Sequence, residues 1–126
     1  GVPDQRIVEL YSEAELAVVP SLYEGFSLPA IEAMSCGVPL VATTGGALPE
    51  VAGTHLETCF LTEPGDSDAL ARTIADALDA PELCAKIGAA GRQRVIDQWS
   101  CRHTALRTVE QYRAVLAEHD AAHGAR

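Results

Sequence analysis

Basic side chains are scarce in this sequence of 126 residues. Nine lysine and arginine residues are outnumbered by eighteen aspartate and glutamate residues, which gives a formal net charge of -9 at pH 7. A chain with this excess of acidic groups lacks the positive surface that attracts the phosphate backbone of DNA or RNA. The composition therefore argues against a nucleic-acid partner.

Long apolar runs are also missing. The longest ones, such as Leu16–Pro20 and Val38–Ala42, are far shorter than the roughly 20 residues that a helix needs to cross a bilayer. A basic segment followed by an apolar one does not open the chain, so we expect no signal peptide and a cytoplasmic location. Because Gly1 rather than Met comes first, a processed chain, a tagged chain and a piece of a longer protein all remain open.

Closely spaced cysteine pairs of the CxxC type are absent. The four cysteines stand far apart, at Cys36, Cys59, Cys84 and Cys101. Without a secretory signal we expect reduced thiols that pack as small hydrophobic groups, rather than disulfides. His119 and His123 are four positions apart, but no third ligand accompanies them, so we expect no metal site.

The composition that remains is that of an ordinary globular domain. Hydrophobic residues make up 48% of the chain and charged residues 21%. A chain of this length buries roughly two-thirds of the surface that its unfolded form exposes, which is enough for a core without disulfides or metal. We predict one domain over residues 1–119 and a flexible polar tail over residues 120–126.

Helices and strands alternate along most of the sequence. The predicted strands are Leu16–Pro20, Pro39–Thr43 and Thr58–Thr62. The first three predicted helices are Arg6–Glu15, Leu28–Cys36 and Pro49–Ala52. The fourth is capped by Asp66 or Ser67 and runs through Asp79, with Leu70, Ile74 and Leu78 on its buried stripe. A fifth runs from Pro81 to about Gln98, and a last helix is capped by Ser100. Strands joined by helical crossovers predict a parallel sheet. Three strands are few for such a sheet, so a small α/β unit and half of a larger one both remain open.

Chemistry-bearing residues gather around the start of the second predicted helix. Glu24 and Gly25 lie in the loop after the first strand, where ligands bind in open parallel sheets. The helix that begins near Ser27 offers free N–H groups to an anion, and Glu32 lies in its second turn. Two carboxylates around an anion site suit the neutral hydroxyls of sugars, because a carboxylate accepts strong hydrogen bonds from them. This pattern favours a nucleotide sugar as the ligand.

The same stretch resembles a known enzyme family. Seven residues separate Glu24 from Glu32, as in the EX7E signature of retaining glycosyltransferases. The run EGFSLPAIEAMSCGVPLVATTGGALPEV is similar to the donor-binding region of the group 1 (family 4) glycosyltransferases with the GT-B fold. The resemblance extends from about Leu10 to the final helix. It implies an α/β fold, in which three parallel strands and flanking helices form the second half of a Rossmann-like GT-B C-terminal domain.

The resemblance also implies roles for individual residues. Glu24 is the catalytic residue and binds hydroxyls of the donor sugar, and Glu32 binds the ribose. The remaining donor-binding positions that it implies are Gly25, the backbone N–H groups of Phe26, Ser27 and Leu28, and the glycine pair Gly45 and Gly46. Neither a metal nor another cofactor is expected.

Plain structural roles remain open for some of these residues. Gly45 and Gly46 also suit a simple turn, and Glu50 suits the first turn of a helix as well as it suits a ligand. Glu32 is either a ligand or a surface helix residue, although the neighbouring Ala33 and Met34 favour a buried face.

The implied activity is hexosyl transfer from a nucleotide-diphosphate sugar with retention of configuration. The acceptor would be bound by an N-terminal domain that this sequence lacks. We therefore expect the 126-residue chain alone to be inactive and to approach a membrane only through the missing domain. We also expect it to self-associate as a homo-oligomer, either edge to edge through residues 16–20 or by exchange of a terminal helix, with a monomer whose edge is covered by the helix Arg6–Glu15 as the alternative. A GT-B sugar-nucleotide epimerase and a non-catalytic nucleotide-sugar or protein-binding module remain as alternatives.

Overall fold

The computed structural model describes residues 1–123. The chain divides into two compact units, the first comprising Gly1–Ile96 and the second beginning at Asp97.

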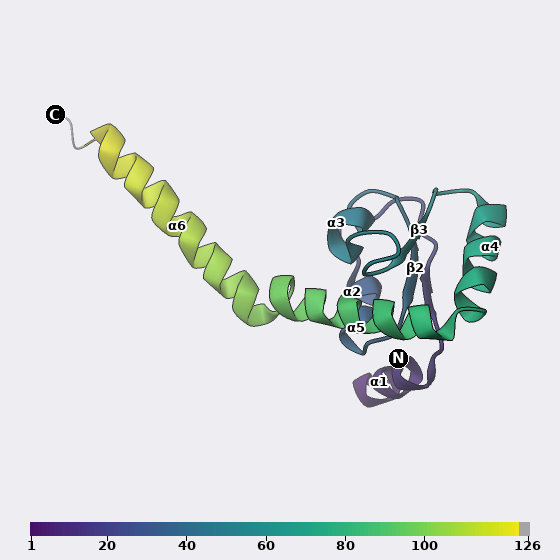
Figure 1. Ribbon diagram of the computed structural model, residues 1–126. Coiled ribbons are helices and arrows are strands. Elements are labelled where there is room, and N and C mark those ends of the chain that lie inside the picture. The colour runs from purple at the N-terminus through teal and green to yellow at the C-terminus, as the bar shows by residue number, and fades with distance from the viewer. Residues whose placement is uncertain (124–126) are drawn as a thin grey trace. The chain divides into compact units, whose positions relative to one another are not determined.

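The first unit alternates helices and strands in the predicted order (Figure 1). Its elements are α1 (Asp4–Glu13), β1 (Ala17–Val19), α2 (Leu28–Ser35), β2 (Leu40–Thr43), α3 (Leu48–Ala52), β3 (Phe60–Thr62), α4 (Ser67–Leu78) and most of α5 (Pro81–Gln98). Each lies within a few residues of its predicted bounds. The α/β fold with a three-stranded parallel sheet is therefore confirmed.

The three strands pair in the order β1-β2-β3, and both pairings are parallel. All of β2 is buried because it is the middle strand, with α2 and α3 on one side of the sheet and α4 on the other (Figure 1). The core on the α4 side is a cluster of buried residues, namely Val41, Phe60, Ala77, Cys84 and Ile87. On the other side α2 buries Ala30, Ala33 and Met34. The sheet is thus covered on both faces, as its apolar strands require.

The helix ends show why the local predictions hold. Asp66 caps α4, where its Oδ1 accepts a hydrogen bond from the Ala69 N–H at 2.8 Å. Ser100 precedes α6 (Cys101–His123) in the second unit, and its Oγ accepts a hydrogen bond from the His103 N–H at 3.2 Å. Both caps are confirmed.

One predicted core position is wrong. Leu78 is 48% exposed, and Ala77 is fully buried in its place. A strict spacing of four residues drifts around a helix that has 3.6 residues per turn, so the stripe that continues the partly buried Leu70 and Ile74 reaches residue 77 rather than 78.

The last helix runs further than predicted. It continues to His123, into the segment predicted to be a flexible tail. Residues 124–126 lie outside the described residues, so the flexibility of the tail stays a prediction. Within residues 1–123, no helix combines the length and the apolar character that a membrane span requires.

All four cysteines are free. Cys59 and Cys84 are buried in the first unit, where their Sγ atoms approach the Thr54 carbonyl oxygen at 3.8 Å and the Ala77 carbonyl oxygen at 3.1 Å. Burial raises the pKa of the Cys59 thiol to about 11 and also raises the pKa of Cys84. These two side chains therefore pack as neutral thiols, as predicted.

Candidate functional site

The loops at the carboxyl edge of the sheet are tied to one another. The side chain of Thr43, the last residue of β2, donates a hydrogen bond to the Ser21 carbonyl oxygen in the loop after β1. The Gly45 N–H in turn donates to Thr43 Oγ1 at 3.4 Å. The Thr44 N–H donates to the carbonyl oxygen of Thr62, the last residue of β3, at 2.8 Å. The segments that follow the three strands thus form one connected edge.

Glu24 lies half-buried in the loop after β1. Its Oε1 accepts a hydrogen bond of 2.8 Å from Ser21 Oγ. Its backbone forms a parallel bridge with Gly46, and its carbonyl oxygen accepts a hydrogen bond of 2.8 Å from the Ala47 N–H. Both the side chain and the backbone of this residue are therefore held by the connected edge.

Gly45 and Gly46 permit this close approach of two loops. A Cβ at Gly45 would lie 2.6 Å from the Leu22 carbonyl oxygen, and a Cβ at Gly46 would overlap the Glu24 carbonyl oxygen. Gly46 also has a φ of 63°, in the left-handed region that side chains disfavour. The glycine pair is more than a simple turn, because it sets the position of the Glu24 loop.

The start of α2 lies between the two predicted ligand carboxylates. Ser27 is the N-cap residue but its side chain makes no capping bond, and Pro29 in the first turn has no N–H. The Ser27 side chain is 1% exposed, and its Oγ has no hydrogen-bond partner within the described residues. A buried hydroxyl without a partner is costly, and this hydroxyl does not cap the helix. The neighbouring predicted positions Gly25, Phe26 and Leu28 are exposed.

Glu32 lies in the second turn of α2 and is exposed. This corrects the interpretation that Ala33 and Met34 place it on a buried face. Those two residues are buried, but a helix turns by about 100° per residue and carries the preceding side chain away from the sheet. The Glu32 carboxylate accepts a hydrogen bond of 3.4 Å from the Tyr11 hydroxyl of α1.

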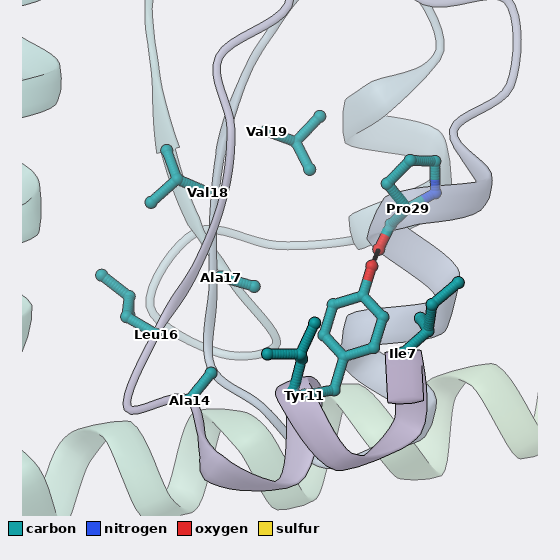
Figure 2. A pocket seen from close by; sticks show the side chains of 9 residues that line it. Ile7, Tyr11, Ala14, Leu16, Ala17, Val18, Val19 and Pro29 are labelled. Carbon is teal, nitrogen blue, oxygen red and sulfur yellow. Dashed lines mark hydrogen bonds between the residues drawn. The ribbon is translucent and has the colours of Figure 1, made fainter. Parts of the chain in front are cut away.

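Tyr11 has polar contacts that the sequence analysis missed, because the spacing of α1 marked it only as an apolar position. Burial raises its pKa, and the negative charge of Glu32, the hydrogen bond to Glu32 and the nearby Cys36 raise it further. Its ring also lines an apolar pocket of about 370 Å³ between α1 and the free edge of β1 (Figure 2). The feature of the sequence that could have revealed the polar contacts of Tyr11 is its hydroxyl group, because a purely apolar helix face does not require one.

Two arginines of α5 were missed as well. Arg92 donates a hydrogen bond of 2.7 Å to the Ser35 carbonyl oxygen at the end of α2. Arg94 donates to the Glu50 and Val51 carbonyl oxygens of α3 at 2.6 and 3.0 Å. Cations are favourable at helix C-termini, so α5 stabilises the far ends of the two helices that start at the carboxyl edge.

Two further charged residues that the sequence brings into question have ordinary structural roles. Arg6 pairs with Glu9 on its own helix at 3.1 Å. Glu50 is an exposed carboxylate in the first turn of α3, which is the structural alternative considered for it. Among residues 1–123, three or more His, Cys, Asp or Glu side chains nowhere gather as they would around a metal ion.

Comparison with known proteins gives consistent matches. The family model described as "Glycosyl transferases group 1" matches residues 1–94. The MMP alpha-(1->4)-mannosyltransferase of Mycolicibacterium hassiacum is 43% identical over 117 residues, which are 93% of this chain and 28% of that protein. The O-antigen chain mannosyltransferase B of Escherichia coli is 37% identical over 112 residues, which are 89% of this chain and 28% of that protein.

Solved structures agree with these relatives. Sucrose-phosphate synthase from Thermosynechococcus elongatus matches with a TM-score of 0.83 and 37% identity, over 93% of this chain and 29% of that one. Anabaena HepE in complex with UDP-glucose matches with a TM-score of 0.77 and 26% identity, over 84% of this chain and 29% of that one. The chain therefore spans well under a third of the length of these proteins.

Proposed function

The chain belongs to the group 1 glycosyl transferases, and on that premise we propose that the carboxyl edge of its sheet binds the nucleotide-diphosphate sugar of a glycosyl transfer reaction. The observation that carries the proposal is the start of α2, where the hydroxyl of the N-cap residue Ser27 is buried without a partner. The carboxylates of Glu24 and Glu32 lie before and after this helix start. The HepE structure supports the ligand class, because that protein is complexed with UDP-glucose.

Each part of the edge has a proposed partner on the donor. The backbone N–H groups of Phe26, Ser27 and Leu28 bind the diphosphate, since a helix N-terminus favours anions. Glu24, the proposed catalytic residue, accepts hydrogen bonds from the hydroxyls of the donor sugar, and Glu32 accepts them from the ribose. No metal or further cofactor is part of this proposal.

The proposed reaction retains the configuration of the sugar. The bond between the anomeric carbon and the diphosphate oxygen breaks through an oxocarbenium-like state, and its electron pair stays on the diphosphate. The acceptor oxygen then bonds to the anomeric carbon from the same face, and its proton passes to the departing diphosphate oxygen. The helix N–H groups stabilise the departing charge, and one such preorganised donor contributes roughly 3–4 kcal/mol.

We also propose that this chain supplies only the donor half of the site. It spans 28% of the mannosyltransferase relative, so the acceptor is assigned to an N-terminal domain outside this sequence. Positioning of two substrates can supply roughly 7–11 kcal/mol of a barrier, so the isolated 126-residue chain should transfer no sugar. Transfer to any acceptor by that isolated chain would contradict this division.

The test of function uses the complete gene product that contains this sequence. Nucleotide sugars are incubated with candidate acceptors, and NMR records both the transfer and the configuration of the new bond. Transfer with retention is the expected result. Isomerised nucleotide sugar without transfer would indicate the epimerase, and binding without turnover would indicate the non-catalytic module. The mannosyltransferase relatives favour hexosyl transfer over both.

Self-association is proposed for the isolated chain. Within the described residues β1 pairs only with β2, and its Val18 is 39% exposed beside the apolar pocket of Figure 2. An unpaired apolar strand edge recruits a second chain. Light scattering at micromolar concentration should therefore detect a homo-oligomer. A monomer whose Val18 and Val19 amides are protected from hydrogen exchange would contradict the proposal.

The location of the protein belongs to the same proposal. We propose a cytoplasmic protein that contacts membranes only through the N-terminal domain, as the sequence analysis predicts. Fractionation of cells that express the complete gene product tests this: the product should stay in the cytosolic fraction when the N-terminal domain is removed.

A further inference from the structure

We infer that Tyr11 is a positioning residue for Glu32 and thereby increases the affinity of the site for nucleotides with an intact ribose. The inference rests on the proposed function, in which Glu32 accepts hydrogen bonds from the ribose. It adds a residue from α1, an element outside the motif that carries both glutamates.

The geometry of the Tyr11 hydroxyl carries the inference. It donates to Glu32 Oε2 and to the Pro29 carbonyl oxygen, in both cases at 3.4 Å. In Figure 2 the hydroxyl points toward the Pro29 carbonyl oxygen at the start of α2. Pro29 and Glu32 lie three residues apart on α2, so a single proton is shared between the first turn of the helix and the carboxylate.

The shared contact leaves Glu32 able to bind a ligand. Both distances are long for an O–H···O hydrogen bond, so neither contact is strong. Such contacts tighten in many enzymes only when the substrate binds. With Oε2 turned toward Tyr11, Oε1 is available to accept from a ribose hydroxyl.

Glu32 requires a side chain that orients its carboxylate more than Glu24 does. Its side chain is exposed, and within residues 1–123 the Tyr11 hydroxyl is the one side-chain group hydrogen-bonded to its carboxylate. A free glutamate loses much rotamer entropy when a ligand orders it. A preorganised carboxylate avoids part of this cost, and the benefit appears as tighter binding.

The Tyr11 ring is half-buried. Its neighbours in the pocket of Figure 2 include Ile7 from its own helix and Ala17 from β1. Burial and the negative charge of Glu32 raise the pKa of the phenol, so the hydroxyl keeps its proton and remains a donor around neutral pH. A hydroxyl that keeps its proton can donate to the Glu32 carboxylate and orient it.

The experiment is calorimetry on the complete gene product with nucleoside diphosphates. UDP and GDP are each compared with their 2′,3′-dideoxy analogues, and the tighter-binding nucleotide is used. In Tyr11→Phe we expect the affinity for the ribonucleotide to fall about three- to tenfold, because one hydrogen bond to a charged group is weakened. The dideoxy analogue should change by less than about twofold, since it lacks the hydroxyls that Glu32 binds.

Two further variants sharpen the test. Tyr112→Phe removes the same atom from an exposed tyrosine of α6 and should leave both affinities unchanged. Tyr11→Phe combined with Glu32→Gln should bind the ribonucleotide no more weakly than Glu32→Gln alone, because the hydroxyl acts through that carboxylate. Thermal melting of each variant shows whether the fold is retained.

Each other outcome contradicts a different claim. An equal loss for ribonucleotide and dideoxy analogue in Tyr11→Phe would assign Tyr11 a purely structural role and overturn the inference. Additive losses in the double variant, or no loss in Tyr11→Phe, would also overturn it. If the wild type binds neither UDP nor GDP, or binds ribonucleotide and dideoxy analogue equally, the proposed function of Glu32 fails and the inference fails with it.

Discussion

Glu24 and Glu32, the two proposed ligand carboxylates, are held in place by different means. Glu24 lies in an irregular loop, and another loop fixes it through the Ala47 N–H and the close approach of Gly46. Glu32 lies on a regular helix, and within residues 1–123 its carboxylate is hydrogen-bonded to one side chain, the Tyr11 hydroxyl, at 3.4 Å. Glu24 therefore depends on contacts with distant segments for its position. Glu32 depends on such contacts only for the orientation of its side chain. Changes at the carboxyl edge should thus affect Glu24 far more than Glu32.

The largest expected effect comes from Gly46→Ala. The new Cβ would overlap the Glu24 carbonyl oxygen, and the φ of 63° disfavours alanine as well. We expect the free energy of unfolding to fall by roughly 2–4 kcal/mol in chemical denaturation. The matched control is Gly25→Ala, where a Cβ meets nothing within 4 Å, and its cost should stay below about 1 kcal/mol. Equal costs for the two variants would show that the glycine pair does not hold the loop.

Thr43→Val should have the next largest effect. Valine has nearly the same shape but leaves the Ser21 carbonyl oxygen and the Gly45 N–H without the threonine hydroxyl. We expect a loss of about 1–3 kcal/mol in unfolding free energy. Thr62→Val is the control, because Thr62 is buried at the equivalent position of β3 and its Oγ1 has no partner within the described residues. That change should be neutral or stabilising, and a loss as large as that of Thr43→Val would contradict the account of the edge.

Ser21→Ala should have the smallest effect on stability. It removes the hydrogen bond of 2.8 Å to Glu24 Oε1, which contributes about 0.5–1.5 kcal/mol. Glu24 then loses its orientation, so transfer by the complete gene product should fall about three- to tenfold. Ser12→Ala deletes a hydroxyl that donates to the Val8 carbonyl oxygen within α1, at the same distance of 2.8 Å, and should leave transfer unchanged. Equal activity of the two variants would remove Ser21 from the site.

The sequence predicts those features that local chemistry determines. Asp66 and Ser100 mark helix starts because their side chains accept hydrogen bonds from N–H groups three residues on. The apolar run of β2 marks a strand because the middle of a sheet excludes water on both faces. The placement of Glu24 before a helix and of Glu32 within it follows from the local start of α2 near Ser27.

Features that depend on distant contacts were not predicted. From the sequence, Gly45 and Gly46 were equally compatible with a simple turn. Their role in the close approach of two loops depends on the backbone of Leu22 and Glu24, which lies directly beside them in the fold. The role of Arg94 likewise depends on its contact with α3, more than forty residues earlier in the chain. No periodicity or motif encodes such a pair, because each partner alone looks like an ordinary surface residue.

The most direct test of the donor site compares Glu24→Gln with Glu32→Gln in the complete gene product. Calorimetry measures the affinity for the nucleoside diphosphate, and a transfer assay measures the activity. Glu32→Gln should weaken nucleotide affinity about ten- to a hundredfold, because it removes charge-assisted hydrogen bonds to the ribose. Glu24→Gln should leave that affinity within about twofold while transfer falls, because its proposed partner is the sugar, which the nucleoside diphosphate lacks. Unchanged nucleotide affinity in Glu32→Gln, or an equal loss of affinity in both variants, would contradict the assignment of the two carboxylates to ribose and sugar.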